Sequence, residues 1–150
     1  MNLLSVVLRA PRPSSMVVMK AEYSKWWSRR GYMAITLFGH VITGSRELAD
    51  ELNGEMGPLM NHEMIHLRQA QSAGNSWWHF YLLYGWFSLA ALRFCRKVKN
   101  SAYVLNPFEM EAYKYMYDMD YLKRNNGLAT AWREYRKMTL NERLKVLGKK

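Results

Sequence analysis

A segment of 24 residues without a charged side chain, 69–92, sets the strongest limit on how this chain can fold. It reads QAQSAGNSWWHFYLLYGWFSLAAL and contains no Asp, Glu, Lys or Arg. A membrane-spanning helix needs about 20 mostly apolar residues. Trp77 and Trp78 at one end, with basic residues after Leu92 at the other, resemble anchors at a membrane interface. The segment therefore predicts a core helix, an interfacial helix or a membrane span.

The residues before this segment carry a metal-binding pattern. His62 and His66 belong to the motif H-E-x-x-H and lie four apart, so a helix presents both imidazoles on one face. Glu63 is rotated so that it can reach a water on the ion rather than the ion itself. Two histidines that bind zinc, with a glutamate as general base, are the arrangement of the zincins.

A catalytic zinc site needs a third protein ligand. There is one cysteine, Cys95, so a Cys-rich site is excluded and the ligand must be a histidine or a carboxylate. The segment NPFEMEAY, 106–113, offers Glu109 and Glu111. They are two apart on a helix and project about 200° from each other, so both cannot face one ion.

The patterns H-E-x-x-H-x-x-Q and P-F-E-x-E-A-Y together resemble a group of short, mostly uncharacterised bacterial zincin-like proteins. The likeness runs from about residue 32 to residue 135. Gluzincins are similar in placing the ligand glutamate downstream on a helix, often as E-x-x-A-D. Glu109, with Ala112 three residues later, fits that spacing, whereas Glu111 does not. Glu111 is then expected to be a surface acid or an acid that hydrogen-bonds one of the metal ligands.

The resemblance implies a zinc-dependent metallopeptidase, a hydrolase with Zn²⁺ as cofactor and a peptide or protein as substrate. It implies His62, His66 and Glu109 as metal ligands and Glu63 as the catalytic residue. Position 113 is Tyr where those families have Asp. The carboxylate that usually orients a ligand histidine is therefore missing, and another group must hold that ring.

A second hypothesis is a non-catalytic, membrane-associated helical protein with a structural or vestigial metal site. The ligands limit the membrane contact, because His66 precedes the charge-free segment and Glu109 follows it. A single crossing would place them on opposite sides of the bilayer. Unless the zinc lies within the membrane or the metal site is wrong, the segment is a core or interfacial helix.

The net charge of +10, from 22 Lys and Arg against 12 Asp and Glu, favours anionic partners. No arginine-rich block, zinc finger or aromatic RNA-binding signature accompanies it, so an anionic membrane surface is favoured over nucleic acid. The apolar run 3–8 follows no basic residue and is too short for a secretion signal. We therefore expect a cytoplasmic location. Association with the membrane surface is left open.

We expect one α+β domain over 1–150, a minimal zincin-like fold that is mostly helical with a small sheet. Residues 1–20 form an irregular lead-in. The segment 32–43 is rich in β-branched and aromatic residues and predicts a strand. It is either a core strand or the sheet edge to which a peptide adds in zincins.

Local signals predict the helices. Proline suits the first helical position, so Pro58 and Pro107 mark two helix starts, and Thr139 with Glu142 forms a capping box. Helices are expected over 58–72, 76–98, 107–124, 128–137 and after 139. Residues 99–106 are expected to be a loop, and 45–57 a polar loop with room for one helical turn. His40 and His79 are expected to be structural, and Tyr103 is expected to pack in the core. The alternative for Tyr103 is a hydrogen bond to a transition-state oxyanion.

Overall fold

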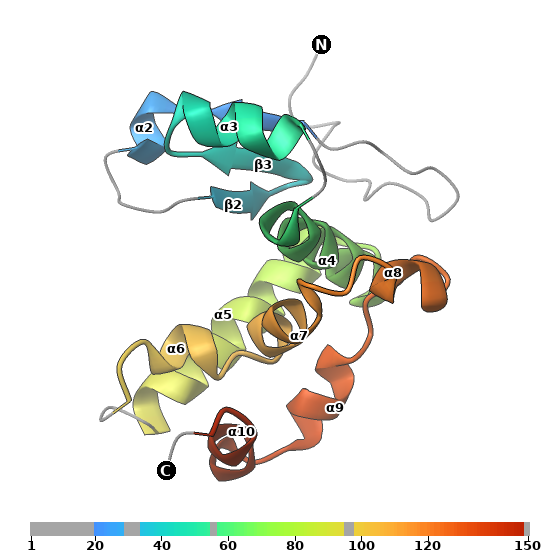
Figure 1. Cartoon of the computed structure of the whole chain (residues 1–150). Helices are drawn as coiled ribbons and strands as arrows, with labels where there is room; N and C mark the ends of the chain where they lie inside the picture. The colour runs from blue at the N-terminus through green and yellow to red at the C-terminus, as the bar shows by residue number, and fades with distance from the viewer. Residues whose placement is uncertain (1–19, 29–33, 55–56, 95–97, 149–150) are drawn as a thin grey trace.

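A small sheet and a larger set of helices make up the described part of the chain (Figure 1). The computed structural model describes residues 20–28, 34–54, 57–94 and 98–148. The strands are β1 (Ala21–Tyr23), β2 (Ala34–Leu37) and β3 (His40–Thr43), in the order β1-β3-β2. β1 runs parallel to β3 and β2 antiparallel to it. The mostly helical architecture with a three-stranded sheet confirms the α+β class.

The expected single strand over 32–43 is wrong, because the segment is a hairpin of β2 and β3. Its turn is Phe38–Gly39, with φ of 49° and 86°, and a tight hairpin turn of this kind needs positive φ at both central residues. Phe38 tolerates this backbone because its ring packs edge-on against three aromatic rings of α5. These belong to Trp77, Trp78 and Tyr81.

The helix in the predicted loop 45–57 is longer than the single turn that the sequence suggests. Residues Arg46–Asn53 form α3, and the Ser45 hydroxyl accepts a hydrogen bond from the Leu48 N–H at its first turn. Ala49 and Leu52 are buried, and α3 covers one face of the sheet (Figure 1). A short helix, α2 (Lys25–Ser28), follows β1. The expected lead-in, 1–20, lies outside the described residues apart from Lys20.

Two long helices follow. The expected helix over 58–72 is confirmed as α4 (Pro58–Ser72), and the expected helix over 76–98 is α5 (Trp77–Phe94), with 95–97 outside the described residues. Gly74 makes the turn between them at φ 103°, where a Cβ atom would lie 2.9 Å from His79 Nδ1. No helix within the described ranges has the length and apolarity needed to cross a membrane.

The C-terminal third is more interrupted than expected. The predicted loop 99–106 contains a short helix, α6 (Ser101–Val104). The predicted helix 107–124 divides into α7 (Pro107–Tyr115) and α8 (Tyr121–Arg124). The predicted helix 128–137 is confirmed only over α9 (Trp132–Lys137), and the capping box starts α10 (Leu140–Val146) as predicted.

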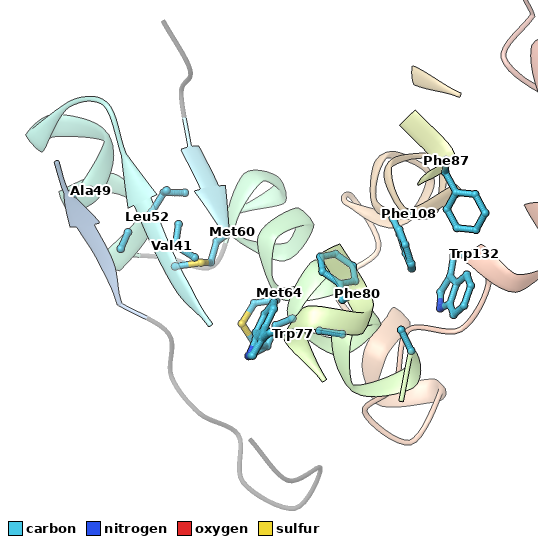
Figure 2. Close-up of a cluster of buried hydrophobic side chains, with 14 residues drawn as sticks. Val41, Ala49, Leu52, Met60, Met64, Trp77, Phe80, Phe87, Phe108 and Trp132 are labelled. Atoms are coloured by element: carbon cyan, nitrogen blue, oxygen red, sulfur yellow. The ribbon is translucent and has the colours of Figure 1, made fainter. Parts of the chain in front are cut away.

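One continuous cluster of buried apolar side chains connects the sheet to the helices. Figure 2 shows it extending from Val41 and Leu52 beside the sheet to Phe108 and Trp132 among the C-terminal helices. α4 lies between the sheet and the pair α5 and α7 (Figure 1). Every residue of α4 from 60 to 71 is buried, so polar side chains on this helix must find partners inside the protein.

Candidate metal centre

The two histidines of H-E-x-x-H face the interior from the middle of α4. His62 and His66 are only 3% and 7% exposed, and their Nε2 atoms lie 3.1 Å apart. The spacing of four residues on a helix produces this convergence, as the sequence predicted. At this distance the two rings share a hydrogen bond, whose direction depends on their tautomers.

Glu109 approaches the same point from the first turn of α7. Asn106 caps this helix by accepting a hydrogen bond from the Phe108 N–H through its side chain, which fixes where Glu109 projects. Glu109 Oε2 lies 3.4 Å from His62 Nε2, and Glu109 Oε1 lies 3.4 Å from His66 Nε2. His62, His66 and Glu109 are therefore brought together and are named here the metal cluster.

The distances within the metal cluster fit a tetrahedral ion. Zinc bonds of about 2.0–2.1 Å place neighbouring ligand atoms of a tetrahedron about 3.3 Å apart. The two Nε2 atoms are 3.1 Å apart, and each lies 3.4 Å from a different oxygen of Glu109, Oε2 for His62 and Oε1 for His66. Glu109 Oε2 is buried and has no hydrogen-bond partner among the described residues. Two imidazoles and one carboxylate are a donor set of catalytic zinc sites, so the residues present suit this ion.

The electrostatics of the metal cluster suit a cation as well. Burial alone would lower the pKa of His66, but the facing Glu109 carboxylate outweighs it and raises the pKa to about 9. Burial alone would raise the pKa of Glu109, and the two imidazoles outweigh it and hold the pKa far below its usual range. Both shifts have the same origin, the attraction between a positive charge and the Glu109 carboxylate, and a bound cation would experience the same attraction.

A glutamine orients one of the two histidines. Gln69 lies one turn after His66 on α4, and its Oε1 accepts a hydrogen bond from His66 Nδ1 at 2.8 Å. With the proton on Nδ1, the Nε2 lone pair of the neutral ring faces the cluster. The sequence reasoning missed this role, although Gln69 was visible as the last letter of H-E-x-x-H-x-x-Q.

Glu111, the acid that does not face the histidines, is the centre of a second polar cluster. It is fully buried and accepts hydrogen bonds from the Gln69 amide at 2.8 Å and the Tyr121 hydroxyl. The N–H groups of Ala131 and Trp132 add two more, at 2.8 and 3.1 Å. We name these side chains and N–H groups the Glu111 cluster. The burial of Glu111 excludes the expectation that it is a surface acid. Gln69 connects the Glu111 cluster to His66, because it hydrogen-bonds both Glu111 and His66.

Tyrosines surround the metal cluster. The Tyr84 hydroxyl of α5 donates to Glu109 Oε1 at 2.7 Å, and burial, followed by the Glu109 charge, raises the pKa of Tyr84. Tyr113, at the position where the resembling families have Asp, packs its ring 4.6 Å from that of His62. No sequence pattern singled out Tyr84, because only the packing of α5 on α7 brings it to Glu109.

Tyr103 is not a core residue, so that expectation is wrong. It is 39% exposed, and its hydroxyl lies 3.0 Å from that of Tyr113. Desolvation and then the nearby Glu109 charge raise the pKa of Tyr103, which keeps its hydroxyl protonated. A protonated hydroxyl near Glu109 remains compatible with the alternative prediction of a hydrogen-bond donor to an oxyanion.

Glu63 lies next to the metal cluster without belonging to it. It is 4% exposed, and its Oε2 accepts a hydrogen bond of 2.6 Å from the Thr36 hydroxyl of β2. Its charge contributes to the raised pKa of His66, which places the carboxylate within electrostatic reach of the cluster. The other two histidines, His40 and His79, are exposed and do not join the cluster.

No protein-family model matches the chain, and no curated protein or solved structure matches it either. The resemblance to bacterial zincin-like proteins therefore stays a prediction. What can be said of the site depends on its own residues and their geometry.

Proposed function

We propose that the protein binds one zinc ion through His62, His66 and Glu109 and hydrolyses peptide bonds, as a minimal zincin. The observation that carries this proposal is the number of donors. Among the described residues, three histidine or carboxylate donors converge and no fourth joins them. Structural zinc is closed by four protein ligands, whereas catalytic zinc has three and keeps a position for water or substrate.

His62, His66 and Glu109 would hold the zinc, which would supply acidification of a bound water and polarisation of the substrate carbonyl. Glu63 supplies the proton transfer: its carboxylate takes a proton from the attacking water and passes it to the leaving amine. The Thr36 hydroxyl fixes one Glu63 oxygen from β2. That contact leaves the other oxygen for the reacting water.

The sheet supports a peptide as the substrate. Among the described strands, β2 lies at one edge of the sheet and against α4. An extended peptide can add to such an edge through main-chain hydrogen bonds. The Tyr81 hydroxyl accepts from the Phe38 N–H at 2.9 Å and donates to the Thr36 carbonyl at 3.3 Å. Tyr81 therefore occupies the edge of β2 at Thr36 and Phe38.

The burial of the ligands favours a second candidate, the non-catalytic protein with a structural metal site. All three ligands are less than a tenth exposed, and Tyr113 covers His62. A catalytic site must admit a substrate, so in the proposed enzyme Tyr103 and Tyr113 have to move apart. The two candidates differ in whether the bound metal keeps a water ligand.

Metal content is the first test. The full chain is purified, supplied with zinc, and measured by mass spectrometry beside the variants Glu109→Ala and Glu111→Ala. We expect one zinc per wild-type chain and its loss in Glu109→Ala. In Glu111→Ala, any molecules that remain folded should retain zinc. A wild type that takes up no zinc would exclude both candidates.

Turnover separates the two candidates. A mixture of fluorogenic peptides is incubated with the zinc-loaded wild type and with Glu63→Gln, which keeps the size of the side chain and removes its basicity. The proposed enzyme cleaves peptides, and Glu63→Gln should retain zinc and lose at least about a hundredfold in turnover. Equal cleavage by both would show that Glu63 is not the base, and no cleavage by either would favour the structural metal site.

A further inference from the structure

The two faces of α5 differ in what they contact. Its inward residues pack in the core, and the buried ones are Trp77, Phe80, Phe87 and Ala91. Its outward residues recur every three or four positions and are mostly large and apolar. They are Trp78, Leu82, Trp86, Leu89 and Leu92, each between 50% and 71% exposed, and we name them the outer stripe. His79 and Arg93 are exposed beside them.

An exposed apolar row of this size needs a partner, because water around it is unfavourable. α5 is 18 residues long, and its inner face is already part of the core. The helix therefore cannot be surrounded by lipid on all sides. It can place one row of side chains into a surface while the rest of the protein stays outside.

The charges around α5 indicate the nature of that surface. The sequence contains no Asp or Glu between Glu63 and Glu109. Over the same segment Arg93 and Lys99 are exposed, and the whole chain carries a formal charge of +10. Among the described acids, Glu63, Glu109 and Glu111 are buried and present no carboxylate at the surface.

We propose that the outer stripe docks α5 on the surface of an anionic lipid bilayer, with the helix in the plane of the interface. Tryptophan is favoured at the boundary between headgroups and acyl chains, and Trp78 and Trp86 both belong to the stripe. Basic side chains near the surface add attraction to anionic headgroups. A second copy of the chain fits less well, because the two positively charged segments would face each other.

The test uses the full-length protein and vesicles of two compositions. One set contains phosphatidylcholine and phosphatidylserine in equal amounts, and the other contains phosphatidylcholine alone. Flotation in a density gradient should recover the protein with the anionic vesicles and much less with the neutral ones, and added salt should weaken the binding. Equal recovery with both compositions, or none with either, would overturn the proposal.

Single substitutions locate the contact. Leu82→Glu and Trp86→Glu should each reduce binding to the anionic vesicles roughly tenfold or more, because each places a charge at the interface in place of an apolar group. Tyr117→Glu is the matched control, since Tyr117 is an exposed aromatic residue on another part of the molecule. It should bind vesicles almost as the wild type does. An equal loss in Tyr117→Glu would mean that net charge, and not the stripe, controls binding.

Light scattering without vesicles tests the competing occupant. We expect a monomer for the wild type and for Leu82→Glu, both with the same thermal unfolding, because the substituted side chain is exposed. A wild-type dimer that Leu82→Glu converts to a monomer would assign the outer stripe to a second copy and overturn the lipid proposal. None of these measurements depends on the metal centre.

Discussion

Glu109 and Glu111 lie two residues apart on α7 and are both buried. Their carboxylates differ in how many hydrogen bonds they accept. Glu111 accepts hydrogen bonds from two side chains and two backbone N–H groups. Glu109 accepts one from Tyr84 and otherwise faces two imidazoles, with one oxygen that no described group hydrogen-bonds.

The difference shows how a buried acid can be assigned a role from its partners. A carboxylate whose acceptor sites are filled by fixed donors has little capacity left for a ligand. A carboxylate with an open acceptor site and two facing nitrogen atoms attracts a cation. The Glu111 cluster therefore holds α4, α7 and α9 together, and the metal cluster is the candidate for chemistry.

The largest expected effect is on stability. Glu111→Ala removes the acceptor of four buried donors and should lower the free energy of unfolding by roughly 3–5 kcal/mol, measured by urea unfolding of the metal-free protein. Glu109→Ala should cost only about 1–2 kcal/mol under the same conditions, because it removes fewer hydrogen bonds. Equal costs would contradict the contrast between the two clusters.

The next effect is stabilisation by zinc. At free zinc one hundred times the dissociation constant, the wild type should gain about 2.7 kcal/mol, measured by urea unfolding with zinc and with a chelator. Glu109→Gln should lose most of this gain. Glu134→Gln, which changes an exposed acid far from the cluster in sequence, should keep it in full.

Gln69 links the two clusters, so its removal should sharpen the comparison. Gln69→Ala frees His66 to rotate and should weaken zinc affinity by about 10- to 100-fold, measured by competition with a chromogenic chelator. Gln71→Ala is the matched control, because Gln71 is a buried glutamine on the same helix and its Oε1 accepts a hydrogen bond from Arg68. If both variants bound zinc as the wild type does, Gln69 would have no orienting role.

The smallest effect is expected at Thr36. Thr36→Val removes the hydroxyl that holds Glu63 and should cost about 1 kcal/mol of stability. On the proposed function, kcat should fall while zinc content and KM stay unchanged. Thr43→Val removes another buried hydroxyl bond from the sheet, to the Ser45 carbonyl, and should cost similar stability without changing kcat.

The parts of the fold that the sequence predicts are those that local chemistry decides. Pro58 and Pro107 begin helices, and Thr139 with Glu142 caps one, because each acts within a single turn. The sequence does not predict the hairpin turn, because the turn contains Phe38 and phenylalanine rarely adopts positive φ. Phe38 does so here within an aromatic cluster. The break after Tyr115 has no Gly or Pro to signal it.

The same division holds for the candidate site. The spacing of His62 and His66 predicts that they face one point, and helix geometry shows that only one of the two acids can join them. Family spacing then favoured Glu109, and the structure brings Glu109 to the histidines. The partnership of Tyr84 with Glu109 depends on how two helices pack, which a single sequence does not specify.

The contact between His66 and Glu109 also has a meaning in terms of chain topology. It joins α4 to α7 and so closes a loop of roughly forty residues that contains all of α5; a covalent cross-link over such a loop would remove about 4 kcal/mol of entropy from the unfolded chain. With a coordinated ion, α5 would be held on a closed loop fastened at both ends. A pull on the outer stripe would then be transmitted to both ends at once, and the molecule would resist detachment as a single mechanical unit.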